Sequence, residues 1–164
     1  GFDSIVSSRK PFGYRTYFEG NTAGKIKLYK RNKNVAYVDK VLKNDEWVNK
    51  YKVLISEASG TGDDPQVLGT PIYSGPGSAC TETHLVIGPF DRKREATFCI
   101  EYMNTKFFRY MVSILKITQH GTRASYRLVP LLPLNKIWTD EELYKKYKLT
   151  DEEIKHIESR ITKR

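Results

Sequence analysis

The sequence predicts an α+β fold with a mixed, largely antiparallel sheet, packed helices and a C-terminal helical hairpin. Three observations predict it: short stretches with β-type alternation fill the first ninety residues, two stretches with helical spacing follow, and two capping sequences stand near the end. The chain has 164 residues, of which 39% are hydrophobic, enough to bury the core of one domain over 1–164.

Loops and β-type stretches alternate over the first forty residues. Residues 7–16 contain a proline, a glycine and three basic residues, which predicts a structured loop. Residues 25–30 alternate in polarity and 34–38 are rich in β-formers. With 31–33 as the turn, these two stretches predict a hairpin whose tip is strongly positive.

The middle of the chain is interrupted by a segment rich in turn-forming residues. We expect a short helix over 44–50 and an apolar strand at 53–55. Residues 56–79 are rich in Gly, Pro, Ser and Asp, which predicts a loop over most of this length. Such long loops are usually functional or mobile. Another strand is expected over 82–88, ending at Gly88-Pro89.

Two helices are expected next, over 92–103 and 105–118. The apolar residues of the second follow the spacing of one buried face: Phe107, Phe108, Met111, Ile114 and Leu115. The opposite face is expected to be exposed and basic: Lys106, Arg109, Ser113 and Lys116. After a break at 119–121, residues 126–134 predict a strand closed by prolines.

The strongest local signal lies in the tail, 139–164. Thr139 and Thr150 are each followed by Asp-Glu-Glu, the pattern of a capping box that starts a helix. Acidic residues stand in the first turn of each helix and basic residues later, which matches the helix dipole. We therefore expect a helical hairpin that packs on the body formed by 1–138 and has a structural role.

Charge is concentrated in the body. The chain carries 28 Lys+Arg and 19 Asp+Glu, a formal charge of +9. The tail holds seven acidic and seven basic residues, so the whole excess belongs to 1–138. A basic body attracts polyanions by releasing their counterions, and nucleic acid is the commonest such partner. A merely solubilising surface is the alternative that charge alone leaves open.

Other totals limit the class of protein. No apolar run approaches the roughly 18 residues needed to cross a bilayer, and no signal peptide opens the chain. We expect a cytoplasmic protein without a membrane partner. Cys80 and Cys99 are too few for a disulfide framework or structural zinc and are expected in the core. The first methionine is Met103, so we expect the start codon upstream of Gly1.

The chain matches the sequence motifs of catalytic sites only in part. The Asn/Asp-Pro-Pro-aromatic segment of amino methyltransferases is missing, and 63–66 (Asp-Asp-Pro-Gln) is the nearest approach. Magnesium-dependent nucleases use an acid-x-Lys pattern beside a second acid. Glu153 with Lys155 and Asp91 with Lys93 have this spacing, but at expected helix starts. The sequence therefore predicts no catalytic residue, no metal site and no cofactor in this chain.

Five segments occur in an order that resembles the C-terminal region of adenine-specific methyltransferases of bacterial type II restriction–modification systems, including those fused to a nuclease. These segments are SSRKPFG at 7–13, KVLIS at 52–56, CTETHLVIG at 80–88, TKFFR at 105–109 and WTDEELY at 138–144. Residues 102–134 also resemble specificity domains of type I restriction subunits. The resemblance implies a target-recognition domain that grips double-stranded DNA. It also implies an upstream catalytic domain in the same polypeptide, which binds S-adenosylmethionine and receives a flipped adenine.

Side-chain chemistry divides the expected DNA contacts into two groups. Phosphate contacts, which set the register on the duplex, are expected from Lys10, Lys25, Lys27, Lys30, Arg31, Lys33, Lys106, Arg109 and Lys116. Base contacts need forked side chains, because a guanidinium pairs with guanine and an amide with adenine. Those candidates are Arg9, Arg15, Gln119 and Arg123.

Three other functions stay open at this point. An RNA-binding module would use tyrosines such as Tyr14, Tyr17, Tyr29 and Tyr37 to stack on unpaired bases, although a core or sheet-face role is commoner. An autonomous magnesium-dependent nuclease would lose cleavage on Glu153→Ala or Asp91→Ala. A purely structural docking domain would bind no nucleic acid even at low salt.

Overall fold

The computed structural model describes residues 1–58, 62–116 and 120–164. Its strands form two three-stranded sheets, where the sequence predicted one. The central sheet has the order β4 (Ile72–Ser74), β3 (Tyr51–Ser56), β6 (His84–Phe90), and both pairings are antiparallel. The outer sheet has the order β2 (Val35–Val38), β1 (Ile26–Tyr29), β5 (Ser78–Cys80), with β1 antiparallel to β2 and parallel to β5.

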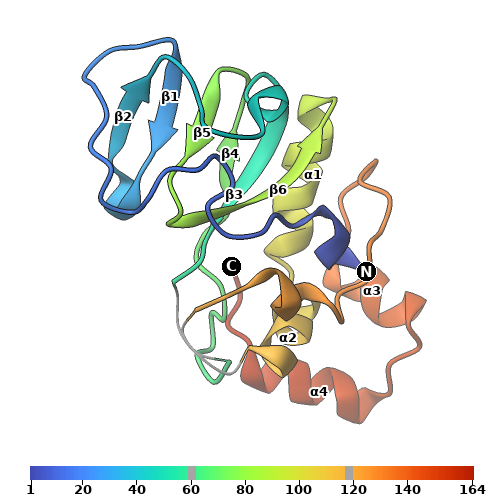
Figure 1. Ribbon diagram of the computed structural model, residues 1–164. Helices are drawn as coiled ribbons and strands as arrows, with labels where there is room; N and C mark the ends of the chain where they lie inside the picture. The colour runs from blue at the N-terminus through green and yellow to red at the C-terminus, as the bar shows by residue number, and fades with distance from the viewer. Residues whose placement is uncertain (59–61, 117–119) are drawn as a thin grey trace.

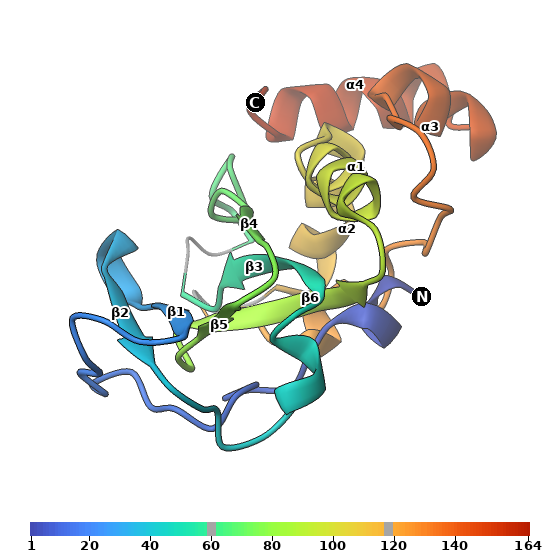
Figure 2. The same cartoon turned by 90° about the horizontal axis from the view of Figure 1, so that it is seen from above.

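Helices cover one side of the central sheet (Figure 1). α1 (Lys93–Met103) and α2 (Lys106–Leu115) follow β6, and the tail forms α3 (Asp140–Lys146) and α4 (Asp151–Arg160). Figure 2 shows α3 and α4 as the outermost layer, on the side of α1 and α2 away from the strands. The described residues also form four short 3-10 helices: η1 (Phe2–Ile5), η2 (Arg31–Lys33), η3 (Asp45–Trp47) and η4 (Arg123–Tyr126). The α+β prediction is confirmed.

β3 is buried on both of its faces. Val53 and Ile55 belong to the core under the helices, whereas Leu54 belongs to a second core shared with the outer sheet. Successive side chains of a strand point to opposite faces, so a strand between two layers carries a continuous apolar run. The Val-Leu-Ile run of β3 thus follows from its place between the helices and the outer sheet.

The predicted hairpin is confirmed, with Ile26 opposite Val38 and Tyr29 opposite Val35. Its turn is η2, where Asn32 and Lys33 have φ values of 57° and 61°. The left-handed region is accessible to asparagine but costs most other residues energy. The tip is therefore a defined turn that fixes where its basic side chains stand.

Three expectations about strands are corrected. The segment 56–79, expected to be mostly loop, contains β4 and β5, strands of three residues that are too short for periodicity to reveal. β6 continues through the cis Gly88-Pro89 bond to Phe90 instead of ending there. The strand predicted over 126–134 is wrong: η4 ends at Tyr126 and irregular chain follows. Its prolines lack the N–H that pairing requires.

The C-terminal helical hairpin is confirmed. The side chains of Thr139 and Thr150 accept hydrogen bonds from the backbone N–H of Glu142 and Glu153, each at 3.2 Å. Asp140 also caps α2, because its carboxylate accepts from the N–H groups of Lys106 and Phe107. α3 is thereby fixed to the start of α2. None of the helices in the described ranges is long and apolar enough to cross a membrane.

Candidate nucleic-acid interface

A cleft of about 850 Å³ lies between the tip of the β1–β2 hairpin and the adjoining ends of β3 and β6. We call it the hairpin cleft. Its lining comes from six segments of the chain: Thr16, Tyr29, Arg31, Asn32, Lys33, Ser56, Glu57, Ala58, Thr70, Ile72, Thr83, His84 and His120. Both sheets contribute to it, so the cleft exists only because the outer sheet packs beside the central one.

The hairpin tip supplies one wall of the cleft, and this wall is basic. Arg31 and Lys33 are exposed and line the cleft on either side of Asn32. The guanidinium of Arg31 lies 4.6 Å from the ring centre of Tyr17, whose side chain is 76% exposed. A cation over an aromatic ring is held by the ring quadrupole. Tyr17 therefore orients Arg31. Its exposed position differs from the core or sheet-face role that was expected for it.

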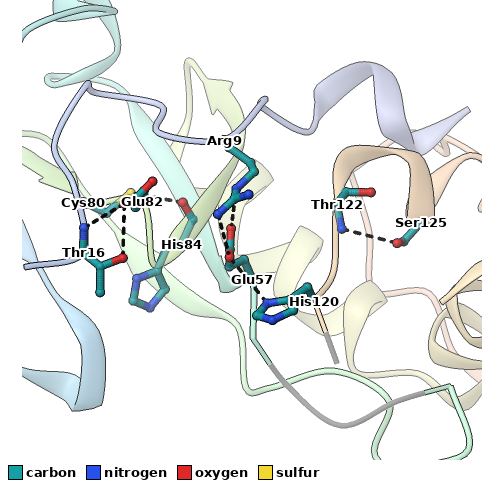
Figure 3. Close-up of polar contacts among 9 residues, drawn as sticks. All are labelled: Arg9, Thr16, Glu57, Cys80, Glu82, His84, His120, Thr122 and Ser125. Atoms are coloured by element: carbon teal, nitrogen blue, oxygen red, sulfur yellow. Dashed lines mark hydrogen bonds and ion pairs between the residues drawn. The ribbon is translucent and has the colours of Figure 1, made fainter. Parts of the chain in front are cut away.

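The other wall centres on Glu57, just beyond the end of β3 (Figure 3). Arg9 and His120 both point at its carboxylate, with Arg9 Nε 3.0 Å from Oε2 and His120 Nδ1 3.6 Å from Oε1. The backbone holds this arrangement, since the N–H of Gly121 donates to the carbonyl of Glu57 at 2.6 Å. Three segments distant in sequence thus meet at one carboxylate.

Glu82 anchors the loop that carries Arg15. Its carboxylate accepts a hydrogen bond from the backbone N–H of Thr16 at 3.1 Å, and its own N–H donates to the carbonyl of Tyr14 at 2.8 Å (Figure 3). The hydroxyl of Tyr14 in turn donates to the carbonyl of Lys40 at 2.6 Å. The residues on both sides of Arg15 are fixed, while its side chain is exposed.

His84 lies in the floor of the hairpin cleft and is only 6% exposed. Its Nδ1 is 3.0 Å from the hydroxyl of Thr83. Burial lowers the pKa of His84 to about 4. The ring is therefore neutral at physiological pH and offers hydrogen bonds without charge.

This shift predicts a loss of stability in acid. As the pH falls from about 6.5 to about 4, the unfolded chain protonates His84 before the folded chain does, so its contribution to stability is lost in that window. The loss approaches about 3 kcal/mol, since one pKa unit corresponds to about 1.4 kcal/mol. Denaturant unfolding of the wild type and of His84→Asn across this window measures it. Equal pH dependence in the two proteins would contradict the prediction.

The predicted contact residues are not all on the surface. Seven are exposed: Arg9, Arg15, Lys25, Lys27, Arg31, Lys33 and Arg123. Three are half-buried: Lys10, Lys30 and Lys106. Lys106 forms an ion pair with Glu158 at 2.9 Å, and Arg123 Nε donates to the carbonyl of Asp3 at 2.9 Å. Gln119, with the rest of 117–119, lies outside the described residues. Of these residues, Arg31 and Lys33 line the hairpin cleft and Arg9 binds its lining residue Glu57, while Lys106 stands apart in the helical layer.

The expectation of an exposed basic face on α2 is wrong. Arg109 is 0% exposed and Lys116 is 3% exposed, whereas Ile114, expected in the core, is 49% exposed. Lys116 Nζ donates to the carbonyl of Val67 at 2.5 Å. Phe107 and Phe108 are buried as expected, but Arg109 is buried as well, because α2 lies between the body and α4. Neither buried cation can reach a phosphate from this position.

The acid-x-Lys patterns have local structural roles. Glu153 accepts a hydrogen bond from the N–H of Thr150 at 2.8 Å and so completes a capping box. Asp91 forms an ion pair with Lys50. Within 1–58, 62–116 and 120–164, no group of three or more His, Cys, Asp or Glu side chains is arranged to hold a metal ion.

Sequence reasoning missed Glu57 and Glu82. No local pattern marks a single glutamate as the centre of a cluster, because its neighbours come from elsewhere in the chain. Comparisons with protein-family models, curated proteins and solved structures found no match to this chain. The function of the chain is therefore inferred from the hairpin cleft and its charges.

Proposed function

We propose that this chain recognises double-stranded DNA in a sequence-dependent way, for an adenine-specific methyltransferase domain of the same polypeptide. The observation that carries the proposal is the hairpin cleft, which has Arg31 and Lys33 on one wall and Glu57 and His120 on the other, with Arg9 bound to Glu57. Cations in a concave site concentrate a polyanion more strongly than the same charges on a flat surface.

The two walls suit two kinds of contact. Lys25, Lys27 and Lys33 of the hairpin are exposed point charges on flexible stems, which suit phosphates. Arg9 and Arg15 are on loops tied down by Glu57 and Glu82, which suits the fixed geometry that base contacts need. The division agrees with the resemblance in the sequence, which implies a DNA target-recognition domain.

Single-stranded nucleic acid is the second candidate. The observation that favours it is Tyr17, an exposed ring beside a cleft-lining arginine. Unpaired bases stack on such rings, and stacking is worth about 1–3 kcal/mol per base. A preference of the chain for single strands over a duplex of the same sequence, lost in Tyr17→Ala, would favour this candidate over the first.

The proposal predicts duplex binding that is strongly salt-dependent. With about four phosphates contacted, affinity falls on the order of 100-fold between about 50 and 200 mM salt, because bound cations release condensed counterions. Fluorescence anisotropy with a labelled duplex measures the slope. Arg31→Gln with Lys33→Gln is expected to flatten the log–log slope by about 2, about one for each contact removed.

The matched control removes the same charge from the tail. Lys145 and Lys155 are exposed on α3 and α4, outside the set that lines the hairpin cleft. Lys145→Gln with Lys155→Gln is therefore expected to leave the slope unchanged. If both double variants weakened DNA binding equally, net charge alone would explain the effect. That result would contradict a binding role for the cleft. Affinity that does not respond to salt would contradict the proposal itself.

A further inference from the structure

Glu57 lines the hairpin cleft and binds Arg9 along one edge of the guanidinium. Another edge of the guanidinium stays available for a ligand. Arg9 Nη2 donates to Glu57 Oε1 at 3.2 Å, and Nε forms an ion pair with Oε2 at 3.0 Å. The carboxylate thus occupies the side of the guanidinium formed by Nε and Nη2. The end of the guanidinium, formed by Nη1 and the second N–H of Nη2, still carries donors in a planar fork.

Exposure agrees with this division. The side chain of Arg9 is 63% exposed, while that of Glu57 is only 13% exposed. Oε2 of Glu57 is buried and accepts no hydrogen bond within the described residues, so the charge of Arg9 is what compensates it. A buried carboxylate needs such compensation. Arg9 is therefore held in place, yet most of it faces the solvent.

Glu57 is itself fixed from the other side. His120 approaches Oε1 at 3.6 Å, and the main chain of 120–121 pairs with 57–58 through the Gly121 N–H and an antiparallel bridge between Ala58 and His120 (Figure 3). An arginine loses much conformational entropy when it binds, and less when it is oriented beforehand. The pair is thus a pre-oriented donor fork.

We propose that Arg9, positioned by Glu57, reads a guanine in the DNA bound at the hairpin cleft. A guanidinium fork matches O6 and N7 of guanine in the major groove, which both accept hydrogen bonds. A phosphate is a poorer match, because the carboxylate of Glu57 repels it and offsets the charge of Arg9. A base edge carries no net charge and avoids this repulsion. The inference rests on the proposed DNA-binding function.

Arg9 differs in this respect from the other arginines predicted to contact bases. Arg123 uses its Nε on the carbonyl of Asp3, a neutral acceptor. Of the base-reading candidates in the described ranges, Arg9 is the one that a carboxylate orients. Glu57 is accordingly a positioning residue, and its effect should appear in discrimination between bases more than in overall affinity.

The test begins with selection from a randomised duplex pool by the purified full chain. The selected site is expected to contain a guanine whose replacement weakens binding at least about 10-fold. Replacing that base by 7-deazaguanine, which lacks the N7 acceptor, is expected to weaken wild-type binding and to have no effect on Arg9→Ala, since alanine carries no donor for N7.

Glu57→Gln separates positioning from folding. We expect it to lower discrimination at the guanine while leaving affinity for unrelated duplexes equal or higher, because a negative charge has been removed. A merely structural loss would lower both. Glu19→Gln, which removes an exposed carboxylate next to the hairpin sheet, is the matched control and is expected to keep the discrimination.

The failures can be told apart. If the chain binds no duplex, the proposed function fails and the inference fails with it. If it binds a preferred site and Arg9→Ala keeps the same guanine preference, or if it binds without any sequence preference, the inference is overturned while duplex binding stands.

Discussion

Replacing Arg109 by alanine is expected to lower the free energy of unfolding by about 3–4 kcal/mol, because it removes a buried cation from three acceptors and leaves a cavity. Nε donates to the carbonyl of Thr105 at 3.2 Å, Nη2 to the carbonyl of Asn104 at 3.2 Å, and Nη1 to Oε1 of Gln66 at 3.4 Å. The side chain is fully buried.

The position of Arg109 explains why a cation is tolerated there. Asn104 is the C-cap of α1, so the guanidinium lies at the negative end of that helix dipole. Burial and the nearby Arg164 lower the pKa of Arg109 to about 10, which leaves the group charged at neutral pH. Its loss would uncap α1 and release Gln66, which Arg164 also contacts at 3.0 Å.

Chemical denaturation compares the free energies of unfolding of Arg109→Ala and Arg94→Ala. Arg94 is an exposed residue of α1, and its replacement is expected to change stability by less than about 0.5 kcal/mol. DNA affinity measured at a temperature where Arg109→Ala is still folded should match the wild type. Full stability combined with weakened DNA binding would show that the side chain reaches DNA, and would contradict its burial.

The elements that local chemistry determines could be predicted from the sequence. Thr139 and Thr150 satisfy the N–H groups of their own helices, and the hairpin of β1 and β2 is made by neighbouring strands, so both signals lie within a short window. β4 and β5 depend on distant partners instead. Three-residue strands carry too little pattern to be recognised without those partners.

The orientation of α2 also depends on distant partners, and it too could not be predicted from the local sequence. The apolar spacing of this helix correctly predicted Phe107 and Phe108 as buried, but it wrongly placed Ile114 in the core and left Arg109 outside it. The helix lies between the body and α4, so tertiary packing decides which side chains are enclosed. The same holds for Glu57, whose place beside Arg9 depends on a contact between residues 48 positions apart.

Lys52 is the second position where a substitution should have a large effect. It is 0% exposed, and its Nζ lies 2.8–3.1 Å from four backbone carbonyl oxygens, those of Trp47, Val48, Lys50 and Gly75, which share its three N–H donors. These carbonyls belong to the chain around η3 and to the turn after β4, so a single ammonium group ties both to β3. Lys52→Met keeps the stem and removes the donors. It is expected to cost about 3 kcal/mol, since buried acceptors are left unsatisfied.

The exposed neighbour Lys50 provides the control. It contacts Asp91 on the surface, and Lys50→Met is expected to cost less than about 1 kcal/mol, as is usual for exposed ion pairs. Thermal or denaturant unfolding at neutral pH compares the two variants. Equal stability of Lys52→Met and Lys50→Met would show that the four contacts of Lys52 contribute nothing to the fold.

The contribution of Lys52 to stability is expected to rise, not fall, as the pH increases. Burial lowers its pKa to about 8 from 10.5, so between these values the unfolded chain binds a proton that the folded chain has released. Its contribution to stability therefore rises with pH from about 8 to about 10.5, by up to about 3 kcal/mol. Cys80 and Cys99 have raised pKa values through burial and act against it in alkali. Cys99 does so equally in both proteins, whereas Lys52 lowers the pKa of Cys80, so that the loss of Lys52 destabilises the variant further in alkali. The difference in unfolding free energy between the wild type and Lys52→Met should therefore widen over this window, and a constant difference would mean that the ammonium group is not desolvated in the folded chain.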